Sequence, residues 1–278
     1  MLANQRIFHY DGGTLEDKSV DLNNIFSAGT VIDLQNADYL YIGSDLPFNH
    51  RYFNVSSANA VISTMSVEIW DGNAWVAAVD VIDQTSTGGK TLAQSGFISW
   101  TLPRNGSWGQ EATTEDIAAL STLKIYDLYW VRLAVSINVS ITTALSYIGF
   151  RFAGDDDLGG YYPSLIGSSV LDAYETGKTT WAEQHFLAAE DIINDIRAKR
   201  IAWNPNQVLN WEQFRLAGIH KVAANIMLAF GDDYKDNRAD AMAEYRAAMN
   251  LKVFEVDTNM DGRRDETEKY PYRGITRT

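Results

Sequence analysis

The residue pattern best suited to chemistry in this sequence is an acidic loop close to its C-terminal end. Residues 257–268 match the twelve-residue calcium-binding loop at positions 1, 3, 5, 6, 9 and 12. Calcium is held by several oxygen ligands within one tight turn, and Gly262 stands where that turn is sharpest. The calcium ligands expected from the pattern are Asp257, Asn259, Asp261, Arg263, Asp265 and Glu268.

Two features limit this interpretation of the loop. Arg264 stands where such loops usually carry an aliphatic residue, and Tyr270 followed by Pro271 prevents a helix from leaving the loop directly. A paired EF-hand is therefore excluded, and the remaining alternatives are a single calcium-bound loop and an acidic surface turn. In both alternatives the loop would hold a terminal segment in place.

Tryptophan rings are the second candidate, because such rings stack on the faces of sugars. The sequence contains 8 tryptophans, and Trp70, Trp100 and Trp130 lie within strand-like runs, where large aromatic side chains usually fill a core. Trp108 lies instead in a glycine-containing loop, 105–109, and we expect it to be the most exposed ring. It is the residue that we single out for glycan binding.

Catalytic patterns are sparse. The chain has 4 histidines and no cysteine, and His185 and His220 stand among apolar helical positions, which favours core or interface roles. The nucleophile-elbow, phosphate-loop and dinucleotide-binding motifs are missing from the sequence. The acidic run 155–157 is interpreted as a solvated linker. We predict that the chain is not an enzyme and requires no cofactor beyond the calcium ion considered above; an acidic glycoside hydrolase is a minor alternative.

The negative net charge of the chain limits the classes of partner that it can bind. The 278 residues carry a formal net charge of −13, from 23 Lys and Arg against 36 Asp and Glu. Neither half has the basic excess that binding to nucleic acid or to an anionic membrane requires. The start lacks a basic segment followed by an apolar one, and no apolar run approaches the ~20 residues of a membrane span. We expect a protein made in a cytoplasm that binds neither membrane nor specific nucleic acid sequences.

The first half of the chain has the pattern of an antiparallel β domain. Short β-branched and aromatic runs alternate there with Gly, Asn, Asp and Ser. Apolar residues alternate through 66–70 and are followed by a turn at 71–74, which predicts a hairpin. The segment 85–89 is expected to be an exposed loop, and 114–123 a helix. The predicted strands are 39–43, 51–56, 64–70, 74–80, 96–102, 128–136 and 146–152.

The second half has the pattern of a helical domain, because the apolar period changes from two to about 3.6 residues after an acidic, glycine-rich segment. Helices are predicted at 180–199, 211–230 and 232–250, with a weaker one at 164–174. The candidate N-caps are Thr179 or Thr180, Asn210, and Asp232 or Asp233.

The predicted fold class is α+β in two domains, an antiparallel β-sandwich followed by an α-helical bundle with an extended tail. The predicted parts are a sandwich at 1–153, a linker at 154–161, a helical domain at 162–250 and a C-terminal tail at 251–278.

The first half also carries sequence patterns that resemble a known module. The segments 67–75, 95–103 and 129–136, together with Trp108, contain the patterns WDG…W, SG.ISW..P and YW.R. These patterns are similar to those of a β-sandwich module that is common in structural proteins of tailed-phage virions. The resemblance covers roughly residues 38–152 and implies a fold and a setting rather than a reaction.

Three segments of the second half carry another resemblance: 180–193, 216–224 and 230–235, followed by Tyr245. They are similar to segments of the head-to-tail adaptor, or connector, proteins of tailed bacteriophages. Members of that family form a ring under the portal, pack side by side through a short helical bundle and reach the portal with a C-terminal segment. The resemblance makes 251–278 the reaching segment. The chain differs from the smallest adaptors by its N-terminal sandwich.

These resemblances imply a structural virion protein that joins the portal to the tail or neck at the head-to-tail junction. It would assemble in the host cytoplasm as a homo-oligomeric ring, expected to contain twelve copies, and an acidic inner surface would let DNA slide through without sticking. The alternative is a glycan- or receptor-binding virion component, in which the β domain is the active part and the helices attach it. Binding of glycans at Trp108 would distinguish the two functions.

Overall fold

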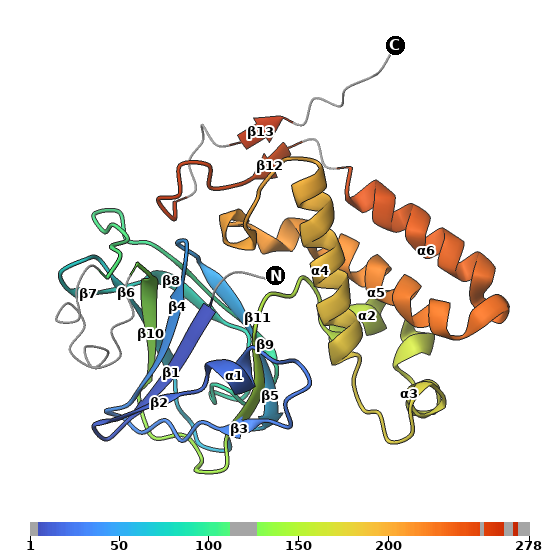
Figure 1. The fold of residues 1–278 in the computed structure, drawn as a ribbon. Helices are drawn as coiled ribbons and strands as arrows, with labels where there is room; N and C mark the ends of the chain where they lie inside the picture. Colours follow the sequence, from blue (N-terminus) through green and yellow to red (C-terminus); the bar gives the residue numbers. More distant parts are fainter. Residues whose placement is uncertain (1–4, 112–126, 251–252, 264–268, 272–278) are drawn as a thin grey trace. The chain divides into compact units, whose positions relative to one another are not determined.

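The computed structural model describes residues 5–111, 127–250, 253–263 and 269–271. Within these residues the fold is mixed α and β, with two large antiparallel sheets and six α-helices (Figure 1). By its internal contacts the chain divides into two compact units. The first, called here the sheet unit, comprises residues 1–149 and 257–263, and the second, the helical unit, comprises 150–256 and 264–278.

Both large sheets belong to the sheet unit. The six-stranded sheet has the strand order β2-β1-β4-β10-β6-β7, and the five-stranded sheet has the order β3-β11-β5-β9-β8. Their strands are β1 Gln5–Asp11, β2 Thr14–Asp17, β3 Thr30–Val31, β4 Tyr39–Ser44, β5 His50–Ser57, β6 Met65–Trp70, β7 Trp75–Ala77, β8 Val79–Asp83, β9 Gly96–Thr101, β10 Tyr129–Val135 and β11 Ala144–Gly149.

Alternating side chains from both sheets fill one apolar core. In β6, Val67 and Ile69 are buried whereas Glu68 between them is half-buried on the opposite face, as the strand period of two requires. The same cluster contains Ile42 from the six-stranded sheet and Phe53 from the five-stranded sheet. Burial of these side chains is the main force that holds the unit together.

The predicted hairpin at 71–74 is confirmed. Trp70 lies opposite Trp75 in the ladder between β6 and β7. Asp71 closes the turn, because its Oδ1 accepts the backbone N–H groups of Asn73 at 2.8 Å and Ala74 at 2.7 Å.

Other parts of the sheet unit differ from the sequence analysis. Each predicted strand overlaps an observed one, but β1, β2, β3 and the short helix α1 Ser19–Leu22 were not predicted. The loop at 85–89 is only partly exposed, because Thr85 is fully buried and donates to the carboxylate of Asp83 at 2.5 Å. The predicted helix at 114–123 lies outside the described residues.

The helical unit is built around α5, which contacts α2, α4 and α6. Its α-helices are α2 Asp155–Tyr161, α3 Ser168–Tyr174, α4 Ala182–Ala198, α5 Arg215–Ala229 and α6 Lys235–Ala248. Short 3₁₀ turns are η2 Pro163–Ile166, η3 Pro205–Gln207, η4 Trp211–Phe214 and η5 Gly231–Tyr234. A two-stranded sheet pairs β12 Val253–Glu255 with β13 Lys269–Pro271.

The predicted helix at 180–199 is observed as α4, and one face of it is apolar. His185, Ala188, Ile192 and Ile196 are all buried along α4, and Trp181 just before the helix is fully buried. Gly231 follows the C-terminal end of α5 with a φ of +73°, a conformation that glycine adopts without strain.

Two predictions for the helical unit are wrong. The acidic segment 154–161, predicted to be a solvated linker, contains α2 at 155–161, whose first turn places three aspartates near the positive end of the helix dipole. The helix starts also lack the predicted side-chain caps: neither Thr180 nor Asn210 bonds to a free amide at the start of its helix. Asn210 donates instead to Glu255 at 2.9 Å.

Candidate functional site

The described part of the calcium-loop motif, residues 257–263, is a turn closed by its own side chains. The carboxylate of Asp257 is 1% exposed and accepts the N–H groups of Asp261 at 3.2 Å and Gly262 at 2.8 Å. Asn259 Oδ1 also accepts from Asp261 at 3.0 Å, and Asp261 Oδ1 accepts from the backbone of Arg263 at 2.8 Å. The polar side chains thus rigidify the turn that the sequence predicted.

Gly262 fits this turn for two reasons. Its φ is +75°, in the left-handed region that disfavours other residues. In addition, a Cβ at this position would overlap the indole nitrogen of Trp108 and crowd Pro47. The glycine therefore permits both the turn and its close approach to the sheet unit.

Arg263 fastens the same turn to a loop of the sheet unit. Its guanidinium donates to the backbone carbonyls of Arg104 at 3.0 Å and Pro103 at 3.4 Å, and also to that of Gly106. A guanidinium presents several donors in a fixed fork, which suits a cluster of carbonyl groups. The motif assigns a main-chain calcium ligand to Arg263, whereas its side chain has this separate, structural contact.

Trp108 lies against the acidic turn at Gly262, although the sequence analysis considered the two as separate candidate sites. The Trp108 ring is half-buried, with its centroid 5.5 Å from that of Phe48 and 6.1 Å from that of Tyr129, and it packs against the apolar core. The prediction that Trp108 is the most exposed tryptophan is therefore wrong. That position belongs to Trp203 in the helical unit, which is 57% exposed.

The buried carboxylate of Asp257 affects its surroundings electrostatically. Burial, and then the negative charge of Asp257, raise the pKa of Tyr129. Tyr129 therefore stays neutral around physiological pH.

The turn brings together three of the six predicted metal ligands, Asp257, Asn259 and Asp261. The side-chain oxygens of Asp257 and Asn259 both accept the backbone N–H of Asp261, and the Asn259 amide donates to the Asp261 carboxylate at 3.2 Å. Asp265 and Glu268 lie outside the described residues. No group of three or more His, Asp or Glu side chains that could hold a metal ion is found in the described ranges. Calcium binding stays a prediction.

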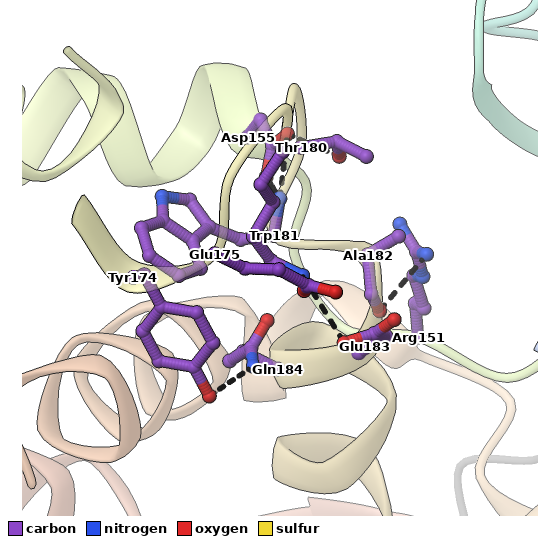
Figure 2. Close-up of polar contacts among 10 residues, drawn as sticks. Arg151, Asp155, Tyr174, Glu175, Thr180, Trp181, Ala182, Glu183 and Gln184 are labelled. Carbon is purple, nitrogen blue, oxygen red and sulfur yellow. Dashed lines mark hydrogen bonds and ion pairs between the residues drawn. The ribbon is translucent and has the colours of Figure 1, made fainter. Parts of the chain in front are cut away.

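The acidic start of α2 forms a second polar site, inside the helical unit (Figure 2). Asp155 Oδ2 accepts from the Thr180 hydroxyl at 2.5 Å and from the backbone N–H of Trp181 at 3.2 Å. Its Oδ1 lies 3.0 Å from Nε2 of His185. One carboxylate thus joins the first turn of α2 to the first turn of α4.

The protonation states of this pair follow from its surroundings. Burial alone would raise the pKa of Asp155, but hydrogen bonds and charge from His185, with further bonds from Thr180 and Trp181, outweigh burial and lower it. Burial lowers the pKa of His185, and the bond to Asp155 offsets this only in part. The pair is therefore a neutral imidazole that donates to an ionised carboxylate.

The neighbouring contacts give this site a structural character. The indole N–H of Trp181 donates to the carbonyl of Leu165 at 2.8 Å, Gln184 donates to the Tyr174 hydroxyl at 2.9 Å, and Arg151 donates to the carbonyl of Ala182 at 3.1 Å. Figure 2 shows the bonds of Gln184 with Tyr174 and of Arg151 with Ala182 at the start of α4.

The His185 and Asp155 pair resembles the base and orienting group of a hydrolase, but its geometry does not support catalysis. Nδ1 of His185 is buried and has no hydrogen-bond partner among the described residues. A base needs a nucleophile or substrate proton within about 3 Å, and the buried ring offers no such access. The predicted core or interface role of His185 fits this arrangement better.

Large exposed apolar side chains are the remaining functional signal in the helical unit. Tyr161 is 55% exposed, Ile166 41% and Leu216 45%. These three lie on α2, η2 and α5, and α2 contacts both η2 and α5. The Tyr161 ring lies 5.9 Å from that of His220, one turn after Leu216, and Ile166 lies against Gly159 of α2. We call Tyr161, Ile166 and Leu216 the apolar helix patch.

Comparison of the chain with protein-family models, with curated proteins and with solved structures finds no match. In the described part of the chain, none of the helices has the length and apolar character needed to span a membrane.

Proposed function

We propose that this chain is a structural protein of a tailed-phage virion, an adaptor that forms a ring between the portal and the tail. In this proposal the sheet unit is a β-sandwich domain that decorates the ring or docks other proteins, and the helical unit is the bundle that packs against neighbouring copies. The tail at 251–278 contacts the portal. The proposal extends the sequence resemblances at 67–136 and 180–245.

The observation that carries the proposal is the apolar helix patch. Tyr161, Ile166 and Leu216 expose large apolar side chains on adjoining elements of a chain whose net charge is −13. Clustered exposed apolar side chains mark protein interaction surfaces, and aromatic residues are enriched in interface cores. A surface of this kind suits side-by-side packing of identical subunits.

The polar site at the start of α4 supports the proposal indirectly. Asp155, Trp181 and His185 fall in or contact the segment that resembles adaptor proteins, and their contacts hold α4 in place rather than perform chemistry. A rigid helical unit is what a ring subunit needs. The alternative function, glycan binding at Trp108, has less support, because that ring packs against Phe48 and the acidic turn.

The test is the particle mass and shape of the full chain, measured by light scattering and negative-stain microscopy. We expect a closed ring of about twelve copies, in line with cyclic assembly. A variant with Tyr161→Asp and Leu216→Asp should lose the ring, because it places charges in the contact. The matched control is Ala243→Asp, which adds an acid at an exposed position of α6 without removing a large apolar side chain. A wild-type chain that stays monomeric at every concentration contradicts the proposal.

A further inference from the structure

One loop of the sheet unit carries a residue pair that is capable of spontaneous chemistry. Residues 103–106 form a β-turn, because the backbone N–H of Gly106 donates to the carbonyl of Pro103 at 2.8 Å. Asn105 is the third residue of this turn and is exposed to water. It is followed directly by glycine, and the sequence contains no other Asn-Gly pair. Asparagine is a chemically labile residue, and the pair is where we expect that lability to be greatest.

The reaction open to this pair is deamidation. The backbone nitrogen of Gly106 loses its proton and attacks the side-chain carbonyl carbon of Asn105, so that a new C–N bond closes a cyclic succinimide. The bond from that carbon to the side-chain nitrogen breaks, and this nitrogen takes up a proton and leaves as ammonia. Water then opens the ring at either carbonyl, which gives aspartate or isoaspartate. Glycine favours ring closure because it has no Cβ to crowd the attacking nitrogen.

The closed turn keeps the attacking nitrogen from reacting. The N–H of Gly106 is bonded to the carbonyl of Pro103, so the turn has to open before this nitrogen can lose its proton and reach the Asn105 side chain. The turn is also tight, because a Cβ on Gly106 would lie 2.8 Å from Cγ of Pro103. Packing therefore requires glycine at this position, and the labile pair is a consequence of that requirement.

Arg263 holds the same turn closed from the acidic turn at 257–263. Its guanidinium donates to the carbonyls of Pro103, Arg104 and Gly106, which stand on both sides of Asn105. One planar group thus spans the labile pair. Hydrogen bonds from a charged donor are stronger than neutral ones, so their loss shifts the turn toward its open form.

We propose that Asn105 is a site of spontaneous deamidation whose rate is set by the contacts of Arg263 with residues 103–106. While the guanidinium is bound, the turn is closed and Asn105 is preserved. When the acidic turn detaches, the three carbonyls are released, the turn opens and Asn105 converts.

Conversion to isoaspartate also acts back on the contact. Isoaspartate inserts an extra methylene into the main chain, between two of the carbonyls that Arg263 binds. The fixed fork of the guanidinium then no longer matches the carbonyls, so detachment of the acidic turn becomes permanent. This site goes beyond the proposed adaptor function and does not depend on it.

The experiment follows Asn105 in the folded full chain by peptide mass spectrometry during incubation in mildly alkaline buffer. Arg263→Gln should raise the rate of deamidation about tenfold over the wild type, because it removes charge-assisted bonds that keep the turn closed. Arg263→Lys keeps the charge but loses the fork, so its rate should lie between the two. The chain unfolded in guanidinium chloride gives the upper limit of the rate.

The matched control is Arg104→Gln, which removes an exposed arginine side chain from the same turn and leaves its backbone carbonyl in place. It should deamidate like the wild type. Asn73 is the internal reference, because it is also exposed but is followed by Ala74, and in the unfolded chain it should react more slowly than Asn105. Circular dichroism and thermal melting of each variant check that its fold is intact.

The effect on the acidic turn is measured on aged protein. A wild-type chain in which Asn105 has converted should be cut by protease at 257–263 faster than the fresh chain. Asn105→Gln, whose longer side chain closes a ring far less readily, should age without this change.

Equal rates in the wild type and Arg263→Gln would overturn the role of Arg263, as would equal acceleration by Arg104→Gln. Lack of conversion at Asn105 in the unfolded chain would overturn the site itself. Unchanged proteolysis of the converted chain would overturn the permanent detachment. Ring formation is measured separately, so failure of the adaptor proposal is distinguishable from failure of this one.

Discussion

The sheet unit and the helical unit satisfy their polar groups in different ways. In the sheet unit, turns are often closed by side chains a few residues away, as Asp71 does for Asn73 and Ala74. In the helical unit, polar side chains reach distant partners: Asp155 accepts the backbone N–H of Trp181, and Tyr245 donates to Asp195 at 2.5 Å. Local sequence therefore specifies the turn at Asp71, whereas these contacts of the helical unit depend on how its helices pack together.

The largest effect is expected from removal of the Trp181 side chain, which contributes both apolar burial and a hydrogen bond to the helical unit. It is fully buried and its indole donates to Leu165. Trp181→Ala should cost about 3–5 kcal/mol of unfolding free energy, because it leaves a large cavity and an unpaired carbonyl. Trp203→Ala, at an exposed ring in the same unit, should cost less than about 1 kcal/mol. Urea unfolding followed by circular dichroism measures both, and equal losses would contradict the prediction.

The acidic turn offers the corresponding test in the sheet unit. Gly262→Val should cost about 2–4 kcal/mol, from its positive φ and from overlap with Trp108. Gly231→Val is the matched control, because Gly231 has a similar φ of +73° and no atom within 4 Å of an added Cβ. We expect the control to lose about 1–2 kcal/mol from backbone strain alone. Limited proteolysis should cut near 257–263 faster in the first variant only; similar behaviour of the two would show that the Trp108 contact contributes little.

Acidification should destabilise both units, because burial lowers the pKa of all four histidines, and that of His50 to about 3. The unfolded chain takes up these protons near pH 6.5, while the folded chain takes them up only at lower pH. Unfolding free energy is therefore fully retained above about pH 6.5 and falls below it, by up to about 1.4 kcal/mol per pH unit for each such histidine. Urea unfolding at several pH values measures the slope, and His185→Gln should reduce it. An unchanged slope in that variant would contradict the role of His185.

A smaller effect is expected from the carboxylate that joins α2 to α4. Asp155→Asn keeps the shape but loses the charge, and it should cost about 1 kcal/mol, since the side chain is 34% exposed and water compensates in part. Asp156→Asn, at the exposed neighbour, should be neutral within about 0.5 kcal/mol. Thermal melting compares the two variants. If they melt alike, the contact of Asp155 with the start of α4 is not a significant source of stability.

Calcium is expected to have the smallest effect on stability. With about 1 mM calcium, melting should rise slightly and proteolysis at 257–263 should slow, because a ligand that binds only the folded loop stabilises it. A chelator should reverse both changes, and Asp257→Asn with Asp261→Asn should abolish the response. Magnesium is the control ion. Identical melting and proteolysis with calcium and with chelator would leave an acidic surface turn as the correct interpretation.

Much of the local structure could be predicted from sequence, and the exceptions share a cause. The hairpin at Asp71, the buried stripe of α4 and the tight turn at Gly262 follow from periodicity and turn chemistry. Asp155 was assigned to a solvated linker because its partners lie 25 to 30 residues further along the chain. Likewise Trp108 was expected to be exposed because Gly262, which lies against it, is distant in sequence. Pairing at such separations leaves no periodic trace in the sequence.

The assignment of residues 257–263 to the sheet unit has a consequence for how this protein can be divided. The chain passes between the units at 149/150, 256/257 and 263/264, so most of the helical unit is an insertion between two pieces of the sheet unit. A fragment ending at residue 149 would lack Arg263 and Gly262 and leave Trp108 without its covering turn. A single proteolytic cut at one of these crossings would not separate the units, because the chain also crosses between them elsewhere. Truncation is therefore a poor way to isolate either unit, and excision of 150–256 with rejoining of the flanking chain is the cleaner design.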